Sequence, residues 1–190
     1  GNVISNDGSN NARFQFDNNN QILIENDSAM NFYVNGNNNL KIDSTGAVTK
    51  PLQPAFLLTP SSSQTNMATD SNVTVVFATE IFDQNSDFSS NTFTAPVTGR
   101  YQLSFHVRIT TMDKDASYTA LRLSTSNRSC DTIVDSNEFS SDVDYVSYSV
   151  SLLMDMDAND TASIIFYQGG GAAQVDTDPN HSYFSGYLVA

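Results

Sequence analysis

Residues 91–109, NTFTAPVTGRYQLSFHVRI, contain the most regular alternation in the chain. From Tyr101 to Ile109 every second residue is apolar, and the residues between them are polar. A period of two places the apolar side chains on one face of a strand and the polar side chains on the other. Pro96 and Gly99 precede this run, as suits a turn that needs a fixed φ and then a residue without a Cβ. The stretch therefore predicts a long strand with one buried face.

Similar runs rich in Val, Ile, Tyr, Phe and Thr recur through the C-terminal region and are separated by Ser, Asn, Asp and Gly. We expect strands near residues 55–59, 73–77, 91–95, 100–111, 117–125, 145–154, 161–167 and 182–189. No i, i+3, i+4, i+7 pattern of apolar residues persists over three turns of a helix. The spacing predicts an all-β antiparallel sandwich, for which a jelly roll is one standard arrangement.

Residues 1–50 differ in composition, because 13 of the chain's 21 Asn residues fall within the first 39 positions. Apolar pairs with a period of two are separated by turn-forming Asn, Asp and Gly, which predicts a meander of short strands. The pairs are Phe14/Phe16, Ile22/Ile24, Phe32/Val34 and Leu40/Ile42. A lone thin meander buries too little apolar surface to offset the entropy of ordering it, so we expect copies to wrap around one another. The alternative is a disordered Asn-rich leader.

Charge and composition exclude several classes of partner. Eight Lys and Arg against 21 Asp and Glu give a formal net charge of −13, which repels nucleic acid and anionic lipid, so we expect no nucleic-acid partner. No run approaches 18 apolar residues and the first 30 residues show no signal peptide, so we expect no membrane insertion. The single cysteine, Cys130, excludes an intramolecular disulfide and a cysteine-based zinc cluster.

Seven residues of the C-terminal region match a known family in order and spacing. They follow the pattern F-x5-D-x4-F…F-x5-G-x-Y-x-x-x-F and are Phe77, Asp83, Phe88, Phe93, Gly99, Tyr101 and Phe105. This pattern resembles the signature of the C1q and tumour-necrosis-factor-like jelly roll, and HSYFSGYLV at residues 181–189 looks like the closing strand of that family. Leu103 stands where the family usually has Phe, and the interval from Phe88 to Phe93 is about two residues shorter, which a loop tolerates.

The resemblance implies a ten-strand-type antiparallel jelly-roll head over residues 51–190, with Tyr101 and Phe105 pointing inward. It also implies a homotrimer in which apolar faces of three sandwiches meet along a threefold axis. The segment LKIDSTGAV at residues 40–48 is similar to a segment that often precedes the terminal head in bacteriophage tail and appendage fibres. No collagen-like Gly-X-Y repeat is present. These similarities predict a β-rich trimeric arm or shaft over residues 1–50.

Acidic residues before the strand expected at 145–154 form the candidate metal site. Within 14 residues lie Asp131, Asp135, Glu138, Asp142 and Asp144. Carboxylate oxygens in excess of basic groups suit Ca²⁺, and C1q-like heads often carry calcium in this position near the trimer apex. The resemblance selects Asp135, Asp142 and Asp144 as ligands, and Asp176 and Asp178 form a second candidate cluster. The alternative is a solvated acidic loop.

Catalytic motifs are missing from the sequence. It contains no G-x-S-x-G, H-E-x-x-H or phosphate-loop pattern. The run from Gly169 to Gly171 has no following Lys, and it predicts a flexible loop. His106 and His181 are the only histidines, and we expect structural or surface roles for both, since acid–base catalysis needs a positioned partner. We therefore expect no enzyme activity and no organic cofactor.

The function predicted from these features is attachment. We expect a viral, phage-type fibre or receptor-binding structural protein on the virion surface, which contacts a host surface glycan or protein and other virion components. The candidate recognition segments are loops 111–117, 126–144 and 168–181, because loops on a rigid sandwich carry binding. Three weak sites add through multivalency. A secreted, extracellular, non-viral C1q-like adhesion or signalling module is the first alternative, and a polysaccharide-degrading head is the second.

Overall fold

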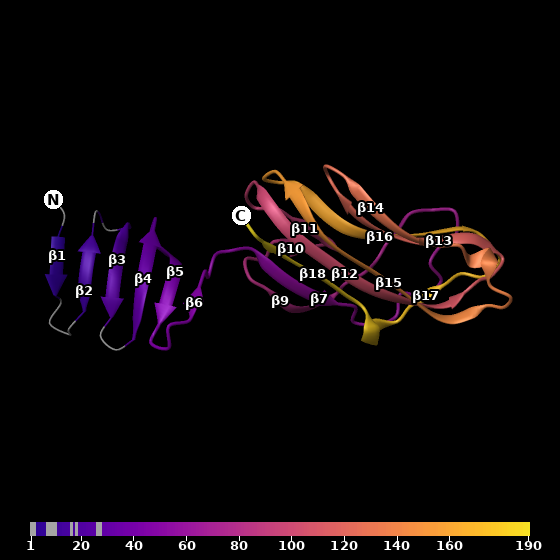
Figure 1. Cartoon of the computed structure of the whole chain (residues 1–190), viewed down its shortest axis with the longest axis horizontal. Helices are drawn as coiled ribbons and strands as arrows, with labels where there is room; N and C mark the ends of the chain where they lie inside the picture. The colour runs from indigo at the N-terminus through magenta and orange to yellow at the C-terminus, as the bar shows by residue number, and fades with distance from the viewer. Residues whose placement is uncertain (1–2, 7–10, 16, 18, 26–27) are drawn as a thin grey trace. The chain divides into compact units, whose positions relative to one another are not determined.

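The computed structural model of the chain is shown in Figure 1. The structure describes residues 3–6, 11–15, 17, 19–25 and 28–190. Phe16, which the sequence analysis places in a strand, lies outside the described residues. The chain divides into two compact units, Gly1–Gln53, called the arm, and Pro54–Ala190, called the head. Among the described residues, no helix is long and apolar enough to cross a membrane.

The arm is one antiparallel sheet of six strands in chain order, β1-β2-β3-β4-β5-β6. The strands are β1 Val3–Asn6, β2 Ala12–Gln15, β3 Gln21–Glu25, β4 Ala29–Val34, β5 Asn37–Asp43 and β6 Val48–Thr49. Asn35 and Gly36 join β4 to β5, and their φ values of 51° and 76° fit a two-residue hairpin turn of type I′. The predicted meander of short strands is confirmed.

The turn between β5 and β6 depends on one aspartate. Asp43 Oδ1 accepts hydrogen bonds from the backbone N–H groups of Thr45 and Ala47, at 2.8 and 3.0 Å. Gly46 follows the turn with a φ of 87°, which L side chains rarely adopt. A hydrogen bond from the Thr45 hydroxyl, together with the backbone bonds, holds the pKa of Asp43 below its usual value. The sequence DSTGA in this segment is therefore explained by the chemistry of a tight turn.

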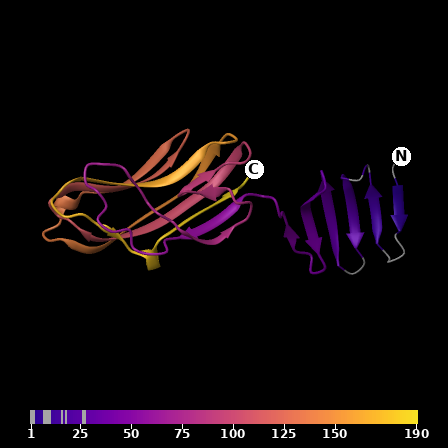
Figure 2. The same ribbon diagram turned by 180° about the vertical axis from the view of Figure 1, so that it is seen from behind.

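The head is a sandwich of two antiparallel sheets (Figures 1 and 2). The β16 sheet has the order β10-β11-β16-β13-β14, with β8 beside β16, and the β12 sheet has the order β15-β12-β18-β7-β9, with β17 beside β12. Strands of the β16 sheet are β8 Val73–Thr74, β10 Phe88–Ser89, β11 Thr92–Thr94, β13 Ala116–Thr125, β14 Ser129–Val134 and β16 Thr161–Gly170. Strands of the β12 sheet are β7 Ala55–Thr59, β9 Thr79–Asp83, β12 Gly99–Met112, β15 Val143–Met156, β17 Asp176–Thr177 and β18 Tyr183–Leu188. The predicted all-β jelly-roll sandwich is confirmed.

The long alternating stretch forms β12, an interior strand between β15 and β18. It pairs with β15 from Gly99 opposite Met156 to Met112 opposite Val143. The apolar residues of the stretch are fully buried between the sheets, and they are Tyr101, Leu103, Phe105, Val107 and Ile109. The inward direction predicted for Tyr101 is confirmed. Its hydroxyl donates to the Val97 carbonyl at 2.7 Å, so the buried ring keeps a partner for its polar end.

The aromatic residues of the signature meet around Phe56 of β7. The ring centroids of Phe93, Phe184 and Phe88 lie 4.8, 5.1 and 5.7 Å from that of Phe56. Asp83 explains the acidic position of the signature, because its Oδ2 accepts the backbone N–H of Phe88 at 2.9 Å. This hydrogen bond closes the turn that returns Phe88 to the core.

Four strands differ from the sequence prediction, because β9, β10, β14 and β17 were not expected. Strand β14 matters most, since it occupies residues 129–134 inside the segment expected to be one recognition loop, 126–144. The strand at 73–77 is shorter than predicted and covers only Val73–Thr74.

Gly169 and Gly170 end β16, which corrects the prediction that they belong to a flexible loop. A Cβ on Gly169 would lie 2.7 Å from Ser117 Oγ, so glycine allows the side chains of the neighbouring strand to pack closely there.

Candidate functional site

Three connections lie together at one end of the head and form the surface called the loop end (Figure 1). It comprises residues 113–115, 135–142 and 171–175. The backbone N–H of Lys114 donates to Asp142 Oδ1 at 3.1 Å, which joins the first two connections. The turn at residues 126–128 lies at the opposite end, where the Ser126 N–H donates to the Thr161 carbonyl at 3.0 Å. The predicted recognition segment 126–144 is therefore divided between the two ends of the sandwich.

A buried carboxylate that the sequence analysis did not single out fixes the loop end. Asp113 Oδ2 accepts the backbone N–H groups of Ala172 and Ala173 at 2.7 and 2.9 Å, and Oδ1 accepts that of Asp115 at 2.8 Å. The hydrogen bond from Ala173 is the largest effect on the pKa of Asp113, and together the bonds lower that pKa although burial raises it. Gly171 has a φ of 85°, and a Cβ there would lie 2.7 Å from Asp113 Oδ2. This position therefore requires glycine.

One exposed aromatic ring projects from the loop end. Phe139 follows the short 3-10 helix η1, Ser136–Glu138, and is 43% exposed. Its neighbours in the connection are mostly serine and acidic residues, and all those from residue 137 to residue 142 are exposed. An aromatic side chain on an ordered loop supplies large contact area at little cost in conformational entropy. Phe139 is therefore the candidate anchor for a ligand at this end.

The three residues predicted to bind calcium do not form a site within one chain. Asp135 caps η1 without a side-chain hydrogen bond, Asp142 accepts the Lys114 N–H, and Asp144 is exposed near the start of β15. Across the described part of the chain, no group of three or more His, Cys, Asp or Glu side chains is placed to hold a metal ion. The calcium prediction stays a prediction that needs ligands from further copies. An unchanged melting temperature on chelation would reject it.

The second predicted acidic cluster is an ion-pair network. Asp178 is buried and accepts hydrogen bonds from Arg108 Nε at 2.8 Å and from Arg108 Nη2. His181 Nδ1 lies 3.3 Å from Asp178 Oδ2. Burial raises the pKa of Asp178, but hydrogen bonds, first those from Arg108, outweigh it and lower the pKa. Asp176 is directed elsewhere, since its Oδ1 accepts the backbone N–H of Asn66 at 2.7 Å.

The outer surface of the β12 sheet, called the β12 face, exposes large apolar side chains. These are Phe82, Tyr145, Leu153, Tyr183 and Tyr187, and the half-buried Leu57 lies beside Phe82. Tyr187 and Leu153 flank Gln102 in one row across the strands, and both are 53% exposed. The centre of the face carries small polar side chains, among them Ser104 and Ser151, whose hydroxyls lie 2.8 Å apart. The rows around Ser104 carry no acidic side chain, whereas Asp155 lies beside Arg100 at one end of the face and Asp144 and Asp176 lie toward the loop end.

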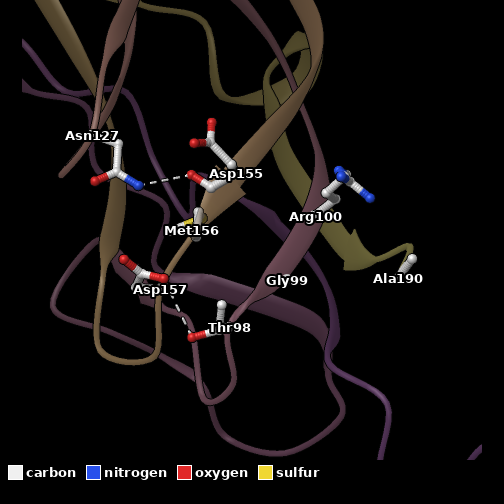
Figure 3. Close-up of a pocket in the computed structure, with 8 residues that line it drawn as sticks. All are labelled: Thr98, Gly99, Arg100, Asn127, Asp155, Met156, Asp157 and Ala190. Atoms are coloured by element: carbon white, nitrogen blue, oxygen red, sulfur yellow. Dashed lines mark hydrogen bonds between the residues drawn. The ribbon is translucent and has the colours of Figure 1, made fainter.

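A cavity of about 250 Å³ lies at the end of the head opposite the loop end (Figure 3). Its lining residues are Thr98, Gly99, Arg100, Asn127, Asp155, Met156, Asp157 and Ala190. Asn127 Nδ2 donates to the Asp155 carbonyl at 3.0 Å, and Thr98 Oγ1 donates to Asp157 Oδ1 at 3.4 Å (Figure 3). The lining contains no histidine or cysteine. Its two carboxylates are held by other contacts, since Asp155 pairs with Arg128 and Asp157 accepts the Thr98 hydroxyl.

Both histidines of the chain border a second cavity of about 360 Å³ on the β12 face. Its lining residues are Leu57, Thr59, His106, Asn180, His181, Ser182 and Tyr183. His106 Nδ1 lies 2.7 Å from Ser149 Oγ, and its ring stacks on Tyr183 with centroids 6.0 Å apart. In the described part of the chain no carboxylate is hydrogen-bonded to His106, so a Ser–His–acid arrangement is not formed.

The comparisons with known proteins agree with this architecture. The sequence model of the C1q domain matches residues 55–189. The chain belongs to the C1q domain family. The globular domain of zebrafish complement 1qA protein is 21% identical with a TM-score of 0.55, over 73% of this chain and 98% of that chain. Murine APRIL at pH 8.0 is 12% identical with a TM-score of 0.53, over 72% and 99%. The structure of murine APRIL at pH 8.5 is 13% identical with a TM-score of 0.51, over 72% of this chain and 99% of that chain.

No curated protein sequence matches the chain. In this C1q domain Leu103, where the family usually has Phe, packs against a glycine on the neighbouring strand. Leu103 lies opposite Gly186 of β18, and a Cβ on Gly186 would lie 2.5 Å from Leu103 Cδ2 and 2.8 Å from Phe56 Cε1. The absence of a side chain at residue 186 therefore makes room for the aromatic cluster of the C1q core.

Proposed function

We propose that this protein is the head-bearing subunit of a homotrimeric, phage-type viral fibre that attaches the virion surface to a host. Its C1q head binds a host surface glycan or protein through the loop end and catalyses no reaction. C1q domains are typically extracellular binding modules that commonly form homotrimers, and the match over residues 55–189 supports this role. The ionisable groups in the cavities of the head are engaged in pairs, Asp155 with Arg128 and His181 with Asp178, which favours binding over catalysis.

The β12 face supports association of three heads. A chain with a net charge of −13 repels its own copies, so a self-associating surface must be poor in acidic groups. The central rows of the β12 face, from Gln102 to His106, meet this condition, and the face exposes aromatic side chains that association would bury. The only basic side chain of the head without an ion pair, Arg100, also lies on this face. It remains available for a carboxylate of another copy.

The arm favours a fibre over a free-standing head. The segment at residues 40–48, which is similar to segments that precede fibre heads, forms the end of β5, the following turn and the first residue of β6. The strands of the arm follow one another in chain order, as in a structure that extends along one direction. Attachment itself depends on one observation, the exposed Phe139 ring on a loop end that buried Asp113 holds in place.

A pair of charge substitutions tests the trimer. Tyr187→Glu places an acidic group on the β12 face, whereas Ile133→Glu places one on the exposed outer surface of the β16 sheet. In sedimentation, the unmodified chain should behave as three chains of 20.7 kDa each. Tyr187→Glu should give mostly single chains, and Ile133→Glu should remain trimeric. If the unmodified protein sediments as a single chain of 20.7 kDa, the proposal is refuted.

Binding of the labelled full-length protein to a panel of intact bacteria tests attachment. We expect binding to at least one strain, and Phe139→Ala should reduce that binding about tenfold or more while the protein stays trimeric. Phe82→Ala, on the β12 face, provides a matched loss of an exposed phenyl ring, and trimers of this variant should bind normally. Binding that is insensitive to Phe139→Ala would remove the loop end as the site.

A secreted C1q-type adhesion or signalling module is the second candidate. The C1q domain match favours it, because that match concerns the head alone and carries no virion context. The same assay separates the two proposals when animal cells are included in the panel. Binding to animal cells without binding to any bacterium would support the secreted module and contradict the phage-type fibre.

A further inference from the structure

One side of the arm sheet carries two rows of apolar side chains, with Asn37 beside Val34 at its edge. The strand register aligns the apolar side chains in one row from β2 to β5 and a second row from β2 to β6. This surface, called the arm face, comprises Phe14, Ile22, Phe32 and Leu40 in one row and Ala12, Ile24, Met30, Ile42 and Val48 in the other. The intervening residues, such as Leu23, Asn31 and Lys41, belong to the opposite side because side chains alternate along a strand.

Nothing in the described part of the arm covers the arm face. None of its nine residues is buried, and Ile24 and Val48 are 44% and 60% exposed. The buried hydrophobic cluster of the chain begins at Phe56, inside the head. A single-layer sheet with one apolar side is stable in water only when that side packs against another layer. The arm face therefore requires a partner.

The opposite side of the arm has its own polar partners. Asn31 is buried, and its Nδ2 donates to Glu25 Oε2 at 3.0 Å. Asn38 Nδ2 in turn donates to Asn31 Oδ1 at 2.8 Å. The charged side chains of Arg13, Glu25 and Lys41 belong to this side by register. Copies of the arm can thus meet through the arm face without burying any charge, which a chain this acidic needs for self-association.

We propose that three copies of the chain place their arm faces around one axis and form a three-sided β-prism. This inference rests on the proposed homotrimer of heads. The strands lie across the axis, and the two rows of each arm face run along it. Each strand from β2 to β5 supplies two inward side chains, so each level of the prism contains six. Successive levels are about 4.8 Å apart, the spacing of paired strands.

The size of the arm face indicates how the prism is held together. The arm face crosses five strands that are about 4.8 Å apart, and its two rows of side chains together cover about 14 Å along each strand. The arm face therefore presents roughly 300 Å² of flat surface. A free-standing interface buries about 800 Å² on each partner. Separate arms would therefore associate weakly. Only residues 50–54 lie between β6 and β7, so three joined heads keep three arms close and raise their effective concentration.

Cysteine cross-linking in the full-length chain tests the prism. In a Cys130→Ser background, Leu40→Cys places a thiol on the arm face, and Leu23→Cys makes the same change on the opposite side. A short bismaleimide should link chains through residue 40 at least tenfold more efficiently than through residue 23. Equal yields in a protein that sediments as a trimer would overturn the prism alone. A protein that sediments as single chains would overturn the proposed homotrimer as well.

Hydrogen exchange in the full-length trimer provides a second, independent measurement. Phe32→Asp puts a charge on the arm face, whereas Tyr33→Asp puts one on the opposite side of the same strand. We expect Phe32→Asp to speed exchange of the amides in β2 to β5 at least tenfold and to leave the head unchanged. Tyr33→Asp should change exchange in the arm by less than about threefold. Equally slow exchange in both variants would overturn the proposal.

Discussion

The head and the arm are both antiparallel sheets with alternating apolar and polar residues, but only the head covers its apolar side with its own chain. In the head the inward residues of β12, from Tyr101 to Ile109, pack against the β16 sheet and are fully buried. In the arm the nine residues of the arm face remain partly or largely exposed. Alternation thus specifies which side of a sheet is apolar, whereas topology decides where the second layer comes from.

This difference separates the stability of the two units. The head has an intramolecular core, so its unfolding should be largely set by packing within one chain. The arm has no core of its own among the described residues, so its order should depend on association and therefore on protein concentration. Substitutions that act on one unit and not on the other test this separation directly.

The largest effect is expected from truncation in the aromatic cluster. Phe56 is 1% exposed and contacts the rings of Phe88, Phe93 and Phe184, so Phe56→Ala should destabilise the head by about 3–5 kcal/mol. Denaturant unfolding followed by a head-specific signal measures this change. The equivalent truncation in the arm, Phe32→Ala, should alter the stability of the head by less than about 0.5 kcal/mol. A loss of head stability comparable to that of Phe56→Ala would show that the units are not separate.

A smaller effect is expected at the loop end from Asp113→Asn. An amide oxygen cannot replace both carboxylate oxygens as acceptors, so the variant should lose about 1–3 kcal/mol near pH 7. The pKa of Asp113 is lowered in the folded head, so its contribution is present above the unfolded value of about 3.9 and is lost as pH falls through the folded value. Urea unfolding at pH 7 and pH 3 should therefore show a smaller pH dependence for the variant.

Asp115→Asn is the control for this measurement. The Asp115 side chain is largely exposed and pairs with Lys114 at 2.5 Å, an arrangement that contributes little to stability in solvent. Its pH dependence of unfolding should remain close to that of the unmodified protein. An identical response of both variants to acid would contradict the role assigned to Asp113.

The smallest effect is expected in the arm, from Gly36→Ala in the hairpin between β4 and β5. The φ of 76° at Gly36 strains any residue with a Cβ by about 1 kcal/mol. Exchange of the β4 and β5 amides should speed up roughly fivefold, with no change in the head. Asn37→Ala, at the next residue, keeps ordinary strand geometry and should have a weaker effect. A change in head exchange on Gly36→Ala would contradict the separation of the two units.

The sequence predicts a strand where its own pattern is strong. The alternation around Leu103 predicts a strand at 100–111, and β12 spans Gly99–Met112. Strand β14 was missed because its inward residues, Cys130, Thr132 and Val134, are small and only partly buried, so its alternation is faint. It is held as an edge strand by pairing with β13, a non-local contact that a local pattern does not contain.

The candidate site was less predictable than the fold, because its important contacts join distant parts of the chain. Asp113 is fixed by N–H groups of Ala172 and Ala173, and Arg108 pairs with Asp178 of another connection. Neither interaction can be predicted from the spacing of residues along the sequence. Conversely, the predicted calcium ligands are close in sequence, yet Asp142 is directed to the Lys114 backbone. Proximity along the chain does not bring carboxylates to one point.

The chain enters the head at the end opposite the loop end. Pro54, the first residue of the head, accepts the Leu188 N–H at 3.0 Å, and β7 then runs between β18 and β9. A pull between Pro54 and a ligand held at the loop end acts along this strand. The hydrogen bonds that join β7 to β18 and β9 are then loaded in shear. They share the force and do not break one after another. A head under such tension should hold its shape until many of these bonds fail together.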